Sequence, residues 1–183
     1  MQLQVSRTPL REAIARLVDH GLVSVVPQVG TRVERIRLSD VEQARFVRET
    51  LEIAAAAVVC GTSERDVHRL RELLVEQERC HESHDFDGFF RADEEMHGQI
   101  FAMSGYSGAW EAVQRMKLQL DRLRRLNRGK VTVRELIDEH AAIVDALEAG
   151  DVQAASEHVS RHARRVLEYG PALRAQYPQF FTE

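Results

Sequence analysis

Apolar residues recur every three or four positions through most of the chain beyond residue 39, which is the spacing of amphipathic α-helices. Capping residues, glycine and proline divide the pattern into six stretches: 39–60, 62–82, 85–103, 107–126, 132–150 and 151–169. Gly170 and Pro171 mark the predicted end of the last one. Amphipathic helices joined by short loops predict a mostly α fold, a six-helix antiparallel bundle over residues 37–170, followed by a tail at 171–183.

The first 36 residues follow a different pattern. A helix is predicted to begin at Ser6, which would cap it, and to end at Gly21. Two β-rich runs, 22–26 and 31–35, then flank a turn at 27–30 and indicate a hairpin. Because a helix followed at once by a hairpin resembles the second half of a winged helix-turn-helix, residues 1–36 are predicted to form a separate, partial DNA-binding domain.

Four polar residues lie on the apolar stripes of the predicted helices: Asp93, His97, His140 and His162. Asp93 and His97 are four residues apart and therefore share one helix face. An unpaired polar side chain in such a position is costly. Imidazole nitrogen and carboxylate oxygen suit divalent transition metals, so the pattern predicts a site for zinc inside the bundle, with nickel, manganese or iron as alternatives.

Each of these residues also has a simpler interpretation, because a single inward histidine is usually a core residue bonded to a carbonyl group. The joint occurrence of four such residues favours the metal. His158 lies four residues before His162 and could replace it. It is nearer the edge of the apolar stripe, so His162 is the predicted ligand.

Arg48 lies on the stripe formed by Val41, Ala44 and Leu51, so its charge is predicted to point into the bundle. Two interpretations stay open at this point. The guanidinium could form an internal salt bridge with Glu49 or Glu52, or it could bind the carboxylate of a small effector. A run of arginines between positions 115 and 128 is interpreted instead as a solvated helix face.

Composition limits the class of protein. The chain is 44% hydrophobic and 30% charged with a formal net charge of −4, which excludes a polycation, so any contact with nucleic acid requires a local basic patch. Its two cysteines are too few for a disulfide framework. No apolar run approaches the roughly 18 residues that a membrane span needs, and no signal sequence is visible, so a cytoplasmic protein is expected.

Two groups of motifs resemble a known family. Residues 5–13, together with Gly21 to Val23 and Gly30–Thr31, resemble the recognition helix and wing of GntR-family transcription regulators. Residues 41–169 resemble the FCD effector-binding domain of the FadR subfamily. The positions that match it are Arg48 to Glu52, Asp93 to His97, Glu139 to Ile143, Ala149 to Asp151, and His162.

The resemblance implies several expectations. Asp93, His97, His140 and His162 would bind a divalent metal, and small organic acids that also reach Arg48 would be the effectors. The protein would be a homodimer on operator DNA. The expected DNA contacts come from the start of the first helix and from the wing: Ser6, Arg7, Thr8, Arg11, Gly30 and Arg32.

The winged helix itself is expected to be truncated at the amino terminus. Family members have two further helices before the recognition helix, and without them Leu10, Ile14 and Leu17 would lack most of their packing surface. The sequence leaves open whether it is cut short there or has lost its ability to read DNA.

The sequence therefore predicts a ligand-responsive transcription regulator, not an enzyme. One rival is a metal-dependent enzyme with Glu94 or Glu139 as general base, but each points away from the neighbouring ligand on its helix. Another is a stand-alone metal- and carboxylate-binding module without DNA-binding activity.

Overall fold

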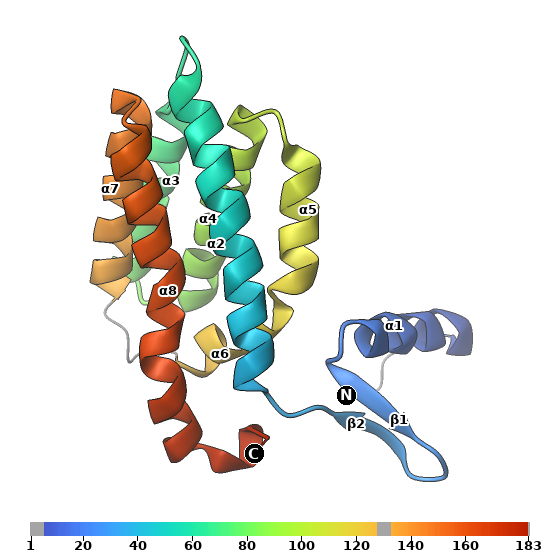
Figure 1. The fold of residues 1–183 in the computed structure, drawn as a ribbon. Helices are drawn as coiled ribbons and strands as arrows, with labels where there is room; N and C mark the ends of the chain where they lie inside the picture. The colour runs from blue at the N-terminus through green and yellow to red at the C-terminus, as the bar shows by residue number, and fades with distance from the viewer. Residues whose placement is uncertain (1–5, 128–132, 183) are drawn as a thin grey trace.

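The computed structural model describes residues 6–127 and 133–182, in which a helical bundle follows a small helix-and-hairpin unit (Figure 1). The first unit consists of α1 (Arg7–Asp19), β1 (Val23–Val26) and β2 (Gly30–Val33). The bundle contains α2 (Leu38–Gly61), α3 (His68–Glu82), α4 (Phe86–Met103), α5 (Ser107–Met116), α6 (Leu118–Leu126), α7 (Val133–Ala149) and α8 (Val152–Gln176). A 3₁₀ turn, Pro178–Phe180, follows. The mostly α fold is confirmed.

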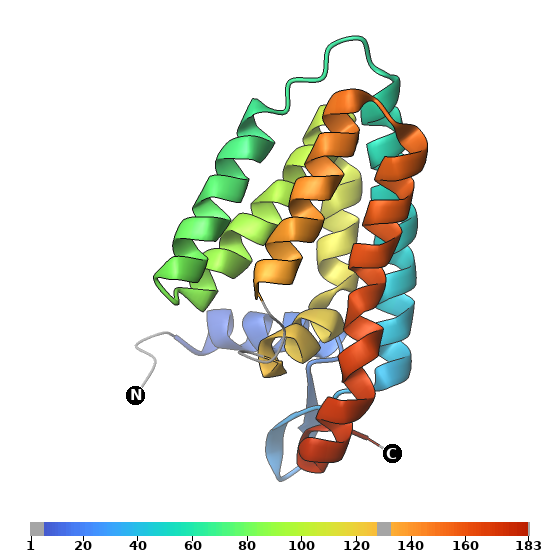
Figure 2. The ribbon, with the colours of Figure 1, turned by 90° about the vertical axis from the view of Figure 1, so that its left-hand side faces the viewer.

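Most of the bundle helices run alongside one another, with α2 packed against α8, α3 against α4, and α7 against α8 (Figures 1 and 2). Their inward stripes build one large core. Its fully buried side chains include Leu70, Met96, Phe101, Ile143 and Leu147. The amphipathic periodicity therefore predicts the inward faces correctly.

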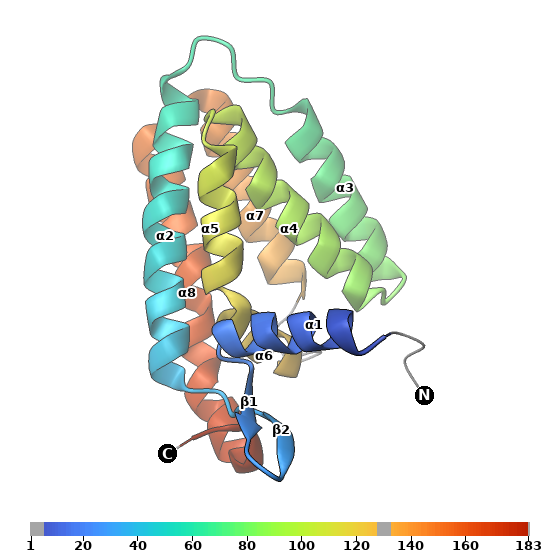
Figure 3. The ribbon, with the colours of Figure 1, turned by 90° about the vertical axis from the view of Figure 1, so that its right-hand side faces the viewer.

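The helix predicted over residues 107–126 is in fact two helices, so the prediction of a six-helix bundle is wrong by one element. The break lies at Lys117, after which α6 crosses the end of the bundle while α5 runs along it (Figure 3). Lys117 is buried, and its ammonium lies 2.7 Å from a carboxylate oxygen of Glu94. Neither glycine nor proline marks this break, so the sequence pattern gave no sign of it.

The predicted stop at Gly170 and Pro171 is also wrong, because α8 continues to Gln176. Proline removes one helical hydrogen bond, but tertiary packing holds the helix together beyond it. Leu173 is buried, and a Cβ on Gly170 would lie 3.4 Å from Leu38. The residues predicted as a tail thus pack against the linker before α2, where the Ile36 amide donates to the Phe180 carbonyl at 2.8 Å.

The helix predicted over residues 62–82 starts later than expected. The Thr62 hydroxyl donates to the Val59 carbonyl at 2.8 Å at the end of α2, and α3 begins only at His68. The first residues of the stretches predicted over 85–103 and 151–169 do act as caps: Asp85 accepts from the Gly88 amide, and Asp151 accepts from the Ala154 amide.

The first unit has the predicted order of helix and antiparallel hairpin, with Val23 opposite Val33 and Val26 opposite Gly30. Ser6 occupies the N-cap position, but its side chain makes no capping hydrogen bond. Measured on the described residues, α1 contains no buried side chain. Across residues 6–127 and 133–182, no helix is both long and apolar enough to span a membrane.

Candidate metal centre

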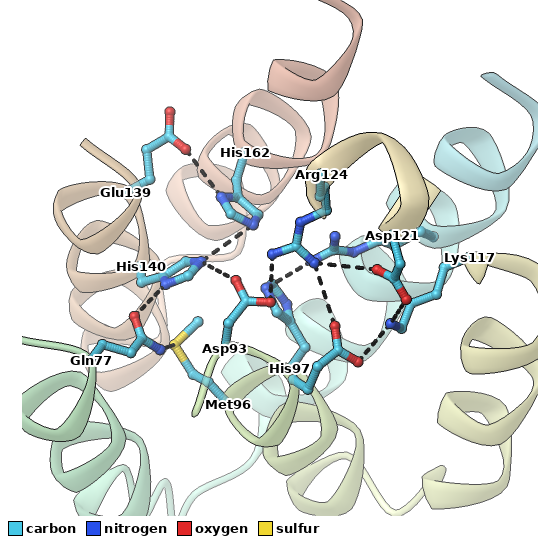
Figure 4. Close-up of polar contacts among 12 residues, drawn as sticks. Gln77, Asp93, Met96, His97, Lys117, Asp121, Arg124, Glu139, His140 and His162 are labelled. Carbon is cyan, nitrogen blue, oxygen red and sulfur yellow. Dashed lines mark hydrogen bonds and ion pairs between the residues drawn. The ribbon is translucent and has the colours of Figure 1, made fainter. Parts of the chain in front are cut away.

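The four predicted ligands meet in the middle of the bundle (Figure 4). Asp93 and His97 come from α4, His140 from α7 and His162 from α8. All four are buried, and one candidate ligand atom from each lies within 4.8 Å of the others. His158 is half-buried and lies outside this cluster. The structure thus brings together the residues that helix periodicity selected.

The spacing of the ligand atoms suits a metal ion. His140 Nε2 lies 3.4 Å from Asp93 Oδ1 and 3.3 Å from His162 Nε2. Ligand atoms bound tetrahedrally at about 2.0–2.1 Å from one ion are about 3.3–3.4 Å apart. Asp93 Oδ1 is buried and accepts no hydrogen bond from any described residue. Because an unpaired buried carboxylate oxygen is costly, this donor set fits a divalent cation.

Two polar side chains orient the imidazoles of His140 and His162. His140 Nδ1 lies 2.7 Å from Gln77 Oε1, and His162 Nδ1 lies 3.0 Å from Glu139 Oε2. Because these oxygens accept hydrogen bonds, each Nδ1 carries the proton and each Nε2 presents its lone pair to the cluster. Gln77 is itself held by a contact from Nε2 to Met96 Sδ at 3.7 Å. Sequence analysis had missed Gln77, because only tertiary packing brings α3 beside α7.

Burial sets the charge of the imidazoles. It lowers the pKa of His162 to about 4, and burial together with the neighbouring His162 lowers the pKa of His140 well below its usual value. Both rings are therefore neutral near pH 7, which is the form that binds metals.

The carboxyl group of Asp93 stays ionised. Burial raises its pKa, but the Arg124 guanidinium and the surrounding histidines outweigh that effect and hold the pKa well below the usual range.

Arg48 forms the first of the two arrangements that the sequence left open, and it also contacts the cluster. Its Nε donates to Glu52 Oε1 at 2.7 Å, so the internal salt bridge is present, with Glu52 as the partner. Its Nη2 lies 2.8 Å from His97 Nε2, which places the guanidinium at the edge of the cluster. Glu49 pairs with Arg45 and Arg164 instead.

Arg124 is a site residue that sequence analysis had missed, because it was interpreted as part of a solvated arginine run. Its side chain is only 9% exposed, and its Nη2 donates to Asp93 Oδ2 at 2.7 Å (Figure 4). Its guanidinium also lies 5.1 Å from the centre of the Phe90 ring. The solvated interpretation holds for Arg115 and Arg125, which are exposed, and Arg128 lies outside the described residues. Arg124 lies four residues after Leu120, which is buried, so the two share one helix face. This spacing in the sequence could have indicated that Arg124 points inward.

A cavity lies against this centre. Arg48, Arg124 and His162 line it, and the centre of a water-sized sphere can move through about 60 Å³ of it. The rest of its described wall is mainly apolar and includes Phe86, Phe89, Phe90, Leu120, Leu136 and Val166. The arrangement can thus hold a small anion between two guanidinium groups and the cluster.

An indole ring also borders the cluster. Trp110 is stacked on His97 with ring centres 6.4 Å apart. Gly98 permits this approach, because a Cβ at that position would lie 2.8 Å from Trp110 Nε1.

The residues predicted to contact DNA are all in the first unit. Arg7, Thr8 and Arg11 are exposed on α1 next to Ser6. Gly30 opens β2 with φ +126°, a conformation that favours glycine. Arg32 is exposed on the same strand and pairs with Glu34.

Comparison with known proteins identifies two matching family models. The model described as bacterial regulatory proteins, gntR family, matches residues 1–33, and the FCD domain matches residues 43–165. A Streptomyces ambofaciens protein described as an uncharacterized HTH-type transcriptional regulator is 35% identical, with 97% of this chain and 75% of that protein covered. The HTH-type transcriptional repressor RspR of Escherichia coli is 28% identical, with coverages of 100% and 81%.

Solved structures show the same fold. The Escherichia coli protein McbR/YncC superposes with a TM-score of 0.78 at 21% identity, covering 94% of this chain and 82% of that one.

The two carboxylates considered as general bases of an enzyme already have partners in the structure. Glu94 is paired with Lys117, and Glu139 is paired with His162 and Arg165. The expectation of a regulator, not an enzyme, is confirmed by the family. The chain belongs to the GntR family of bacterial transcription regulators and carries an FCD domain.

Proposed function

We propose that this regulator binds a divalent metal and a small carboxylate effector in its helical domain, and that the effector controls DNA binding. The observation that carries the proposal is the buried cluster of Asp93, His97, His140 and His162 beside a cavity with two guanidinium groups. Zinc is the expected ion, with nickel, manganese or iron as alternatives, because all four ligands are nitrogen or oxygen donors. The expected location is the cytoplasm.

For DNA binding, we propose that Arg7, Thr8 and Arg11 on α1 and Arg32 in the hairpin contact the operator, with Ser6 and Gly30 shaping the backbone there. All four side chains are exposed. Guanidinium groups contact phosphates and guanine edges, whereas a threonine hydroxyl contacts phosphates. A homodimer is expected, because twofold symmetry matches a palindromic operator.

The helix α6 offers a physical link between effector and DNA. At one side it holds Arg124, which is bonded to Asp93. At the other side Gln119 Nε2 donates to the Gly21 carbonyl at 3.2 Å, and Arg122 donates to the Glu34 carbonyl. A carboxylate that competes for Arg124 would therefore shift α6 and, with it, the placement of the hairpin unit.

The metal content of purified protein tests the proposal. His140→Ala and His162→Ala should each remove the metal, because each leaves the buried shell of ligands incomplete. His158→Ala is the matched control and should retain one metal per chain by elemental analysis. Equal loss in the control, or no metal in any preparation supplied with zinc, nickel, manganese and iron, would overturn the metal assignment.

The effector part is tested separately, by calorimetric titration of metal-loaded protein with small carboxylates, and by operator binding with and without them. If no carboxylate binds, the effector part is wrong even if the metal is present.

A further inference from the structure

The walls of the cavity restrict the kind of carboxylate it can accept. Carboxylates with several charged or hydroxyl groups need several polar partners when they are buried. The described wall provides such partners through Arg48, Arg124 and His162 beside the cluster, and through Asn127, Arg165 and Tyr169. Phenylalanine, leucine and valine side chains make up most of the remainder. An apolar ligand body would therefore be accommodated without unpaired polar groups.

The charges around the cluster limit the ligand's charge. Ion pairs connect the cluster to a network of charged side chains among the described residues. Its four cations are Arg48, Lys117, Arg124 and Arg165, and its five carboxylates are Glu52, Asp93, Glu94, Asp121 and Glu139. Glu135 also pairs with Arg165 but is exposed to solvent, so it is not counted. This network carries one net negative charge. A divalent ion reverses it to one net positive charge, which a single carboxylate neutralises.

Arg48 connects the metal to the ligand. Its Nη2 donates to His97 Nε2, the nitrogen that faces away from Glu52 and is available as the ligand atom. One lone pair cannot serve both a guanidinium N–H and a metal ion. Metal ligation by His97 therefore releases an Arg48 donor, which is still anchored to Glu52 through Nε. That donor is then available to a carboxylate.

We propose that the cavity binds a monocarboxylate with a compact apolar or aromatic body, that it prefers this class to di- and tricarboxylates, and that it does so only with the metal in place. This inference rests on the proposed function and narrows it to one class of effector.

The test compares five probes on zinc-loaded protein by calorimetry: benzoate, its neutral analogue benzamide, acetate, succinate and citrate. Benzoate should bind on the order of tenfold or more tightly than succinate and acetate, because succinate buries a second charge and acetate lacks the apolar body. Benzamide should not bind measurably. Removal of zinc with a chelator should abolish benzoate binding, with folding checked by circular dichroism.

Substitutions in the cavity wall distinguish residues that contact the apolar body of the ligand from residues that contact its carboxylate. Leu136 is only half-buried, so Leu136→Gln should fold while weakening benzoate binding on the order of tenfold and leaving acetate unchanged. Leu167→Gln, at an exposed leucine on α8, is the control and should change neither. Arg48→Met should weaken both carboxylates.

The outcomes distinguish this inference from the proposed function. Three results would overturn the inference but leave the effector proposal standing. They are tighter binding of succinate or citrate than of benzoate, binding of benzoate without metal, and binding of benzamide as tight as that of benzoate. Absence of binding by all four carboxylates to metal-loaded protein would overturn the effector proposal itself.

Discussion

The two units of this chain are held together in opposite ways. In the first, α1 has no buried side chain among the described residues, and Leu10 and Leu17 are each 39% exposed. In the bundle, by contrast, even charged groups such as Arg48, Glu52 and Asp93 are at most 3% exposed. The bundle therefore contains a buried polar network that allows few alternatives, whereas the first unit depends on weak contacts with its surroundings.

The strongest test of the contrast removes Arg124 from the bundle network. Arg124→Met keeps an unbranched apolar stem near Phe90 but leaves the Asp93 carboxylate buried without its cation. In protein freed of metal, the free energy of unfolding in urea should fall by about 3–5 kcal/mol. Added zinc should recover part of that loss.

The matched control for this variant is Arg125→Met, because Arg125 is 61% exposed and its pair with Asp87 is on the surface. Its effect should stay within about 0.5 kcal/mol. Similar losses in both variants would mean that the Arg124–Asp93 pair does not hold the bundle as described.

A smaller effect is expected at Gln77, which orients His140 without touching the cluster itself. Gln77→Leu has similar volume but cannot accept the Nδ1 proton, so zinc affinity should fall about 10- to 100-fold. Competition with a chromogenic chelator measures this. Gln77→Glu, which restores an acceptor, should recover much of the affinity, whereas equal loss in both variants would assign Gln77 to packing alone.

The contact between α6 and the hairpin unit can be weakened without changing the core of the bundle or the hairpin itself. Arg122→Met removes the donor to the Glu34 carbonyl but leaves Arg124 in place. We expect benzoate affinity to change less than twofold, roughly 0.4 kcal/mol, while the effect of benzoate on operator binding diminishes. Fluorescence anisotropy with operator and scrambled duplexes measures it. An undiminished effect would show that the signal does not pass through α6.

The smallest effect is expected in the first unit itself. Leu17→Ala should change the free energy of unfolding of the bundle by less than about 0.5 kcal/mol, since the side chain is partly solvated. Leu70→Ala, at a fully buried leucine, should cost about 2–5 kcal/mol. Comparable costs for the two variants would remove the contrast between the units.

The parts of this molecule that could be predicted from sequence are those fixed by helical periodicity. Asp93, His97, His140 and His162 could be found because each lies on the inward stripe of one of three helices. The turn of the chain at Lys117 could not, since neither glycine nor proline marks it, and the ion pair of Lys117 with Glu94 joins segments that are distant in sequence. Arg124, by contrast, was missed although its spacing of four residues from Leu120 placed it on an apolar stripe, because the neighbouring arginines favoured a solvated face.

The end of α8 and the partner of His140 could not be predicted for another reason. Pro171 is a local signal to stop, but the burial of Leu173 against the linker overrides it. Gln77, on another helix, becomes relevant only when α3 packs beside α7. Such features depend on contacts between distant segments, which periodicity within one helix does not contain.

The position of Trp110 gives the chain an optical label at its own candidate metal centre. It is the single tryptophan of the sequence, and its ring is stacked on His97. Zinc has a filled d shell, whereas nickel and iron have partly filled d shells that quench a nearby excited indole. Intrinsic emission should therefore drop when nickel is added and change little with zinc, so the identity of the bound ion can be followed in unlabelled protein.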